Sequence, residues 1–407
     1  FGNVDYIGCW FLVAARNLHH YSQGSFAFVS TSSLFQGEQA EIVLHIMRKY
    51  SLKIAWAHTS FLWSNNAANN AGVTCCIVGC EIERPGSEKF IYENGARRQV
   101  GNIGPYLVPM PDVVVSKRQS PLSGLTAMGY GSMSNDDGEF TIRPSDYEKI
   151  IAEDPDSKAL IKITLGGAEF IRGIVRRSLY IDEKVNLSHK QKELFSEIFN
   201  RVQKYRASSN RAATQKLSGV PMFFAERRHR EAKKIFVPQV LSERREYVTG
   251  GILAENALVI APHMQVVGGQ VFEFSVLSSR MHHVWVATVC GRLKTDIRYS
   301  NLLGWNTFPV PVLTEKNVTD LSRCAEDILL AREAHFPATI AELYDPKRMD
   351  EEFSDLRAAH DRNDETLERI YIGRRFRNDT ERLEKLFELY TKMTTKDLNK
   401  TNSRMKA

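Results

Sequence analysis

The chain has 407 residues, of which 43% are hydrophobic and 25% charged, a composition typical of a soluble globular protein with two or three domains. No apolar stretch approaches the ~18 residues that a bilayer span needs, and the first residues do not resemble a signal peptide. We therefore expect a cytoplasmic protein without membrane contacts. The net charge is only +6, but residues 201–250 hold twelve Lys or Arg against four Asp or Glu. This local excess indicates either a phosphate-contacting face or a solvated surface that is merely basic.

The first eighty residues alternate between helical and strand-like patterns. They predict, in order, an amphipathic helix over 4–18, a strand at 26–30, a helix after the turn 36–38, and strands at 54–58 and 73–80. This order is that of the C-terminal half of a doubly wound, Rossmann-like α/β sheet without its first strands. Such a sheet would expose an edge, so we expect the chain to have been cut from a longer protein.

Three of the six cysteines, Cys75, Cys76 and Cys80, fall within the last of these strands. They lack a Cys-x-x-Cys pair and a suitably spaced histidine, so the spacing does not indicate a metal site. We expect them to pack as small apolar side chains and predict no bound metal.

Three domains are predicted from the changes in composition along the chain. A polar, turn-rich stretch from 84 to 98 ends the first domain, 1–98. A mixed α/β domain follows over 99–311, with helices expected at 188–206 and 281–293 and a strand at 234–238. The last domain, 312–407, is predicted to be helical from apolar stripes that include Leu321, Ile328, Leu383 and Phe387.

One run in the middle domain concentrates cations, amide and hydroxyl donors, and aromatic rings. It comprises residues 277–285, 291–301 and 306–309. Lys and Arg neutralise phosphates, while Arg and Asn have the shapes that best hydrogen-bond the edges of guanine and adenine. The run therefore indicates contact with DNA.

Three sets of residues carry a resemblance to a known family. The first is 28–39 with His58 and 61–65, the second is 105–107 with 165–171 and 242–247, and the third is the central run with 343–346 and 376–383. Together they resemble the MmeI-like (type IIG) family, whose members join a DNA adenine-N6 methyltransferase to a nuclease and a target-recognition domain. The first set resembles the later methyltransferase motifs, the second the recognition domain, and the third the end of that domain and the helical tail. The similarity covers nearly all of the chain in family order.

The sequence also departs from the family pattern. A Gly-rich cofactor loop after the first strand and an Asn-Pro-Pro-aromatic tetrad are both absent, and we expect them upstream of Phe1. Residues 66–70 replace a charged stretch, and Ser178-Leu179-Tyr180 replaces a more typical Cys-Leu-Trp. The resemblance implies S-adenosylmethionine as the methyl donor, bound mainly outside this chain, so the chain alone should be catalytically incomplete.

The resemblance also implies site residues. It places Trp63, with Phe61, where such enzymes stack an extruded adenine, whereas the residue pattern alone favours a core aromatic at a strand end. The expected DNA contacts are Arg244, Arg245, Arg280, His282, Arg292, Lys294, Arg298, Tyr299, Asn301 and Asn306. Rival explanations stay open for several of these. Arg292 and Lys294 could instead cap a helix, and Arg244 and Arg245 could be a solvated or ion-paired surface pair.

Two functions follow from these expectations. The first is part of a sequence-specific DNA adenine-N6 methyltransferase, in which this chain carries target recognition and works with double-stranded DNA and the missing N-terminal half. The alternative is a DNA-binding specificity subunit that works with a separate catalytic chain. A pure specificity subunit has no use for half a methyltransferase sheet, so residues 1–80 favour the first.

Overall fold

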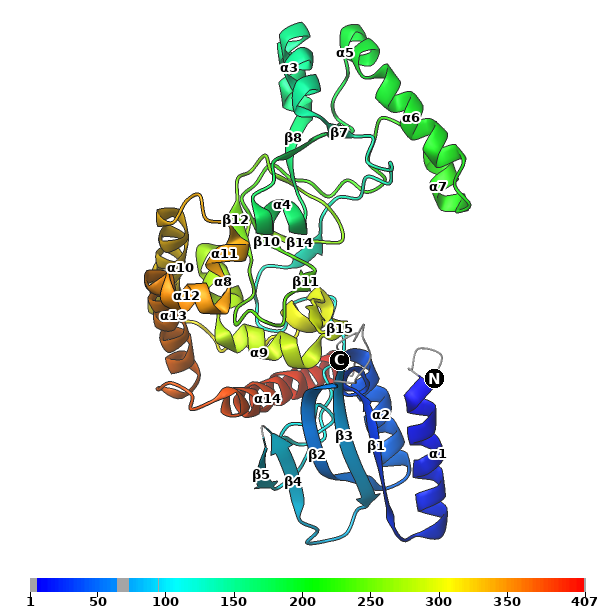
Figure 1. Ribbon diagram of the computed structural model, residues 1–407, viewed down its shortest axis with the longest axis vertical. Helices are drawn as coiled ribbons and strands as arrows, with labels where there is room; N and C mark the ends of the chain where they lie inside the picture. The colour runs from blue at the N-terminus through cyan, green and yellow to red at the C-terminus, as the bar shows by residue number, and fades with distance from the viewer. Residues whose placement is uncertain (1–5, 64–72, 94, 406–407) are drawn as a thin grey trace.

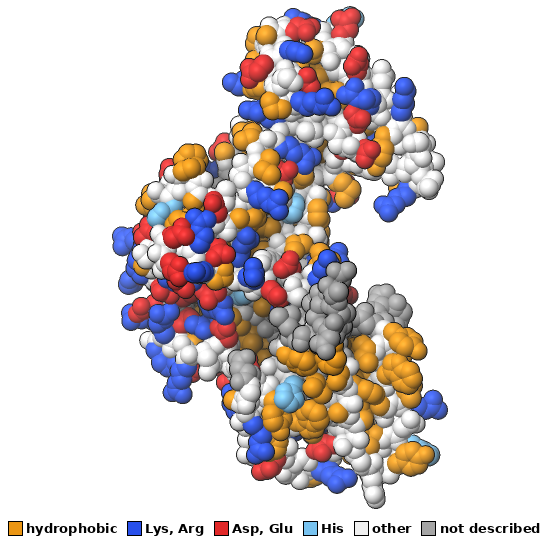
Figure 2. Space-filling model, in the orientation of Figure 1, with side chains coloured by type: hydrophobic (Ala, Val, Ile, Leu, Met, Phe, Trp, Pro, Cys, Tyr) orange, Lys and Arg blue, Asp and Glu red, His pale blue; other side chains and the backbone are white. Residues whose placement is uncertain are grey.

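The computed structural model describes residues 6–63, 73–93 and 95–405. Figure 1 shows a curved molecule with a lobe at each end of a middle region, and the space-filling view in Figure 2 shows a hollow between the lobes on one side. The N-terminal residues form the lower lobe. The helices of residues 315–372 lie along the side of the middle region away from the hollow, and the last helix runs from there beneath the middle region towards the lower lobe. No helix in the described ranges is long and apolar enough to cross a membrane.

The lower lobe is a five-stranded sheet with two helices packed on one face. Its elements are α1 (Tyr6–Tyr21), β1 (Ser25–Thr31), the 3-10 helix η1 (Ser32–Phe35), α2 (Gly37–Lys49), β2 (Leu52–Trp63), β3 (Val73–Ile82), β4 (Lys89–Glu93) and β5 (Ala96–Val100). The strand order is β1-β3-β2-β4-β5. Because β1 and β2 are each antiparallel to β3, they are parallel to one another, and their carboxyl ends lie at the same edge of the sheet.

The alternation of side chains along β1 explains which face of the sheet is covered. Phe26 and Phe28 point towards α1, where their ring centroids lie 5.2 and 6.1 Å from that of Phe11. Ala27 and Val29 point the other way and are exposed, Val29 to 47%. The sheet face of β1 opposite the helices is therefore bare.

Residues 84–98, which their polar, turn-rich sequence predicted to end the first domain, contribute two further strands to its sheet. Residues 89–93 and 96–100 form a hairpin that joins β2 and widens the sheet. Polar residues outnumber apolar ones in this stretch, but Ile91 is buried. At the adjacent position, the Arg97 guanidinium lies 4.3 Å from the centre of the Phe90 ring. Gly95, at φ +78°, supplies the left-handed turn.

The middle region and the upper lobe are built from three small sheets with strand orders β12-β10-β14-β6, β11-β16-β15 and β13-β8-β9-β7. The first elements are β6 (Met128–Tyr130), β7 (Thr141–Ile142), α3 (Pro144–Glu153), η2 (Pro155–Leu160), β8 (Ile161–Leu165), α4 (Gly167–Arg172), β9 (Arg176–Leu179), α5 (His189–Leu194), α6 (Ser196–Ala207), α7 (Ala212–Lys216) and η3 (Leu217–Gly219). The remaining elements are β10 (Lys234–Val237), β11 (Val240–Leu241), β12 (Gly251–Leu253), β13 (Leu258–Val259), β14 (Met264–Val267), α8 (Val271–Leu277), α9 (Arg280–Val289), β15 (Gly291–Leu293), β16 (Asp296–Arg298) and the π-helical turn η4 (Asn301–Trp305).

Two of the predicted helices differ from the structure. The helix expected over 188–206 is divided at Phe195 into α5 and α6. The helix expected over 281–293 ends at Val289, because Cys290 is extended (ψ 156°) and Gly291 begins β15. Arg292 and Lys294 therefore lie on a hairpin and not on a helix.

The C-terminal part is helical, as predicted. It comprises α10 (Glu315–Ala334), α11 (Ile340–Leu343), α12 (Pro346–Glu351), α13 (Ser354–Ile372) and α14 (Asp379–Met405). α14 connects α9 with the segment that follows the lower sheet, because the Phe387 ring packs against both Trp285 of α9 and Tyr106. One hydrophobic core therefore runs from the middle region through the C-terminal helices and reaches Ala40 of α2.

Candidate nucleic-acid interface

β1 and β2 end at the same edge of the lower sheet, which is the candidate catalytic edge. In open α/β sheets, ligands bind outside the carboxyl ends of parallel strands. Phe61 and Trp63 stand at the end of β2 with ring centroids 6.4 Å apart. Trp63 is 46% exposed, so it is not the core aromatic that the residue pattern alone favoured. Ser64, Asn65 and the departure at 66–70 lie outside the described residues.

A cavity of about 630 Å³ lies between this sheet and the middle region. The start of α2 forms one wall, and the β15–β16 hairpin forms the other. The lining residues used below are Glu38, Lys117, Tyr130, Gln239 and Arg298. Lys117, which also lines the cavity, forms an ion pair of 2.6 Å with Glu38 of α2.

The two walls meet through their backbones at two glycines. Gly37 adopts φ +54°, and a Cβ there would lie 3.3 Å from the Gly291 nitrogen. A larger residue at Gly37 would be strained in its backbone and would press on the hairpin. The β15–β16 hairpin, the candidate recognition hairpin, thus packs directly on the first turn of α2.

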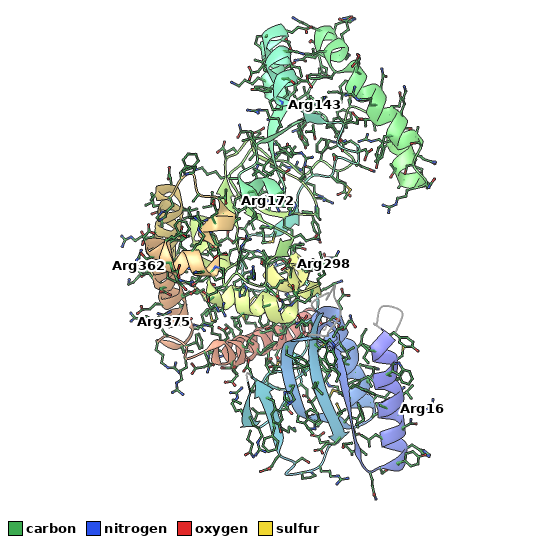
Figure 3. All side chains as sticks on the ribbon, in the orientation of Figure 1. Arg16, Arg143, Arg172, Arg298, Arg362 and Arg375 are labelled. Atoms are coloured by element: carbon green, nitrogen blue, oxygen red, sulfur yellow. The ribbon has the colours of Figure 1, made fainter. Side chains whose placement is uncertain are left out.

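Strand alternation decides which hairpin side chains are available to a ligand. Within β16 and the residue after it, Ile297 and Tyr299 are buried, whereas Arg298 is exposed between them. Lys294 is exposed at the turn, where it adopts φ +57°. Figure 3 places Arg298 on the side of the middle region that faces the hollow, and Arg362 and Arg375 on the opposite side.

Four of the expected DNA contacts are wrong as direct contacts, because the structure buries them. His282 is hydrogen-bonded to the Tyr299 hydroxyl at 2.9 Å, and burial lowers the His282 pKa to about 3, so the ring is neutral. The Asn301 amide donates to the Met128 carbonyl and the Asn306 amide donates to the Arg118 carbonyl, each at 2.8 Å. These side chains satisfy core polar groups.

Two of the expected cations are also engaged within the protein. Arg280 forms a 2.5 Å ion pair with Asp379 of α14, so it joins the middle region to the C-terminal helices. Arg292 donates to the carbonyls of Thr295 and Ala287, the latter in the last turn of α9. The helix-capping explanation therefore holds for Arg292, and burial lowers its pKa.

The cations that remain available are Arg244, Lys294 and Arg298, which are exposed, and Arg245, which is half-buried and whose pKa burial lowers. Tyr130, Lys117 and Gln239 line the same cavity as Arg298 and were missed in the sequence. Tyr130 is 38% exposed at the end of a three-residue strand, too short to produce a period. Among the described residues, no group of three or more His, Cys, Asp or Glu could hold a metal ion.

The three parts of the chain match three models of one protein family. Residues 1–93 match "MmeI, DNA-methyltransferase domain", residues 109–312 match "MmeI, target recognition domain", and residues 312–398 match "MmeI, C-terminal domain". The chain belongs to the MmeI family. This finding confirms the family and the fold class predicted from the sequence.

Individual relatives agree with the MmeI family assignment. DNA methyltransferase A of Bacillus subtilis (strain 168) is 35% identical over 391 residues, covering 96% of this chain and 44% of that protein. The solved structure of the Type IIL restriction-modification enzyme MmeI in complex with DNA matches with a TM-score of 0.84 and 31% identity, covering 97% of this chain and 53% of that one. The chain thus spans about half the length of the relatives that it matches.

Methyltransferases of this kind generally use S-adenosylmethionine, but the described residues do not form a complete site for it. Nucleotide-like cofactors are held in open sheets by a Gly-rich turn between a strand and a helix. In this chain β1 is followed instead by η1, whose Ser32, Leu34 and Phe35 side chains are buried. The segment that follows β1 is therefore not a Gly-rich cofactor turn.

Proposed function

We propose that this chain is the target-recognition part, with the later strands of the catalytic domain, of a sequence-specific DNA adenine-N6 methyltransferase. One observation carries the proposal. The start of α2, just beyond the carboxyl end of β1, and the exposed Arg298 of the recognition hairpin line the same cavity. A duplex read by the hairpin would therefore lie next to the catalytic edge of the sheet.

The chemistry requires the target base to leave the helix. Methylating an exocyclic amine inside a duplex needs the base to be rotated out and held against an aromatic surface. Trp63, supported by Phe61, is the exposed aromatic at the catalytic edge, and stacking on it would contribute roughly 1–3 kcal/mol. We assign both residues to holding the extruded adenine.

Recognition is assigned to the side chains that remain available at the hollow. Arg298 is suited to two hydrogen bonds with guanine, while Lys294, Arg244 and Arg245 are suited to phosphates. Lys117 and Tyr130 extend this surface towards the lower lobe. The side chains of His282, Tyr299, Asn301 and Asn306 are buried, so we assign them to holding the hairpin in place and not to contacting the DNA.

The methyl donor, S-adenosylmethionine, and the N-terminal half of the methyltransferase are the remaining partners in this proposal. The bare sheet face at Ala27 and Val29 supports the N-terminal half as a partner, because a doubly wound sheet is covered on both faces. The presence of the lower sheet also favours the enzyme over a separate specificity subunit.

The test starts from the enzyme that contains this chain and the N-terminal half. Expressed in a host without its own DNA methylation, it should deposit N6-methyladenine at one sequence motif, mapped by sequencing that detects modified bases. Methylation of cytosine, or of no base, would contradict the proposal. This chain alone should transfer no methyl groups from labelled S-adenosylmethionine above background, and turnover by the chain alone would contradict its assigned incompleteness.

Binding supplies an independent check of DNA recognition. Affinity for a duplex carrying the mapped motif should fall steeply with salt, with a log–log slope near −0.9 for each neutralised phosphate. A flat response would show that the chain does not bind the phosphate backbone.

A further inference from the structure

The helices of the upper lobe carry a run of positive charge that no motif accounts for. Between Glu197 and Glu226 the sequence contains five Lys or Arg and no Asp or Glu. This stretch comprises most of α6, all of α7 and the turn η3, and we call α5, α6, α7 and η3 together the arm. A surface with only one sign of charge attracts polyanions.

Three of the five cations are available to a ligand. Lys204, Arg211 and Lys216 are exposed, and their side chains have no ion-pair or hydrogen-bond partner among the described residues. Arg201, by contrast, is paired with Glu139 at 2.5 Å, and Arg206 is buried. The available charges therefore belong to the end of α6 and to α7, at the free end of the arm.

Arg206 explains why this free end is held in one position. Its guanidinium donates all five of its hydrogen bonds to backbone carbonyls, those of Ser134, Asn135, Leu217, Val220 and Phe223, at 2.8–3.2 Å. A fully satisfied buried cation thus ties α6 to the end of the arm, to the segment that follows it and to the turn at Ser134 and Asn135. A fixed array of charges loses less conformational entropy on binding than a mobile one.

The position of the arm matches the path of a duplex. Figure 1 shows the arm descending from the upper lobe so that α7 hangs over the hollow, across from the lower lobe. Figure 2 shows Lys or Arg side chains at this lower tip and others at the middle of the hollow, near the recognition hairpin. A rod-shaped polyanion lying in the hollow would meet both.

We propose that the arm is a second DNA-binding element, which grips the phosphate backbone of the same duplex through Lys204, Arg211 and Lys216. This inference rests on the proposed function, because the duplex must lie in the hollow. Its available cations are two lysines and one arginine, which can contact phosphates as charges, so we expect the arm to add affinity and no sequence preference. Base recognition stays with the hairpin.

The experiment compares R211Q/K216Q with the control R362Q/R375Q in the enzyme that contains this chain. The control removes two exposed arginines from the side opposite the hollow (Figure 3). A duplex with the mapped motif and one with a single base pair of it changed are titrated between 50 and 200 mM salt. Removing one phosphate contact should make the log–log slope shallower by about 0.9. Over this fourfold rise in salt, wild type should therefore lose about 3.5-fold more affinity than a variant that lacks one contact.

We expect R211Q/K216Q to have a shallower slope and an unchanged preference for the motif, and the control to behave as wild type. An unchanged slope in R211Q/K216Q, with a steep wild-type slope, would overturn the arm proposal alone. Disappearance of the preference for the motif would overturn the assignment to phosphates. A flat wild-type slope would instead overturn the proposed DNA binding itself.

Discussion

At the scale of single residues, the central run divides into buried side chains that hold the fold and exposed cations, Lys294 and Arg298, that remain available to a ligand. Arg298 and Asn301 are only three residues apart, yet Arg298 is exposed and Asn301 is 7% exposed. Both are side chains that hydrogen-bond bases well, so residue type alone could not separate them. The separation comes from the alternation of β16 followed by the turn η4, which buries Tyr299 and Asn301 together.

Replacing Arg298 by Ala should relax the preference at one base pair of the motif at a cost of roughly 1–3 kcal/mol, because the paired hydrogen bonds to one base are removed. R298K should restore part of the affinity but not the preference, since an ammonium lacks the planar fork. The measurement is binding to a set of duplexes, each with one base pair of the motif changed. Equal weakening on every duplex would make Arg298 a phosphate contact.

Asn301→Ala is the matched control for Arg298. It removes the donor to the buried Met128 carbonyl, so it should lower the free energy of unfolding by about 1–3 kcal/mol and leave base preference unchanged.

At the scale of elements, the sequence predicted the helices and strands whose own residues show a clear spacing of apolar side chains. The first helix, the strands at 26–30, 54–58 and 73–80, and the helical C-terminal part were all found from spacing. The hairpin at 89–100 was missed because its outward residues, such as Arg97 and Arg98, outnumber its buried ones. The end of α9 was misplaced because a helix buried on nearly every side has no polar face to mark its boundary.

The arm depends on one buried cation, so Arg206→Met should release it. The substitution keeps an apolar stem but leaves five carbonyls without their donor, and each one that stays dry costs about 1–3 kcal/mol. Amide hydrogen exchange should therefore accelerate over 196–219 and not over α13. Arg201→Met, which removes exposed ion pairs with Glu139 and Glu197 and no buried hydrogen bond, is the control. Unchanged protection in R206M would mean that other contacts fix the arm.

The junction between α13 and α9 contains a carboxyl group whose titration should be measurable. Burial raises the Asp364 pKa from 3.8 to about 7, although the carboxyl accepts hydrogen bonds from the Arg280 N–H and the Tyr247 hydroxyl. The folded state therefore holds the proton more tightly than the unfolded state does. This group favours folding most below pH 4 and contributes progressively less as the pH rises towards 7.

Compared with wild type, Asp364→Asn should remove this contribution to the pH dependence. The difference in unfolding free energy between the two proteins should change by at most about 1.4 kcal/mol per pH unit between pH 4 and 7. Chemical denaturation of both proteins at several pH values measures this difference in unfolding free energy. Parallel curves for the two proteins would show that Asp364 titrates normally.

At the scale of the whole molecule, the curvature places three surfaces around one hollow (Figures 1 and 2). They are the arm, the β15–β16 hairpin that we propose for recognition, and the edge of the lower sheet that we propose for catalysis. The sequence indicated a basic window at 201–250 but could not divide it between the arm and the middle region. That division depends on how distant segments pack, above all on the contacts of Arg206 with carbonyls up to 72 residues away.

The separation of these surfaces predicts that recognition and base extrusion can be uncoupled. Trp63→Ala in the enzyme that contains this chain should slow methyl transfer about 5- to 150-fold, the equivalent of losing 1–3 kcal/mol of stacking. Motif preference and the salt slope should remain, because Arg298 and the arm are untouched. Trp63→Phe should recover most of the rate.

A mismatch at the target adenine lowers the cost of rotating the base out of the duplex, so it should speed Trp63→Ala more than it speeds wild type. Single-turnover methylation of matched and mismatched duplexes measures both effects. If Trp63→Ala instead lost affinity for every duplex to the same extent as methylation, Trp63 would be a general binding residue, and the extruded adenine would be held elsewhere on the sheet edge.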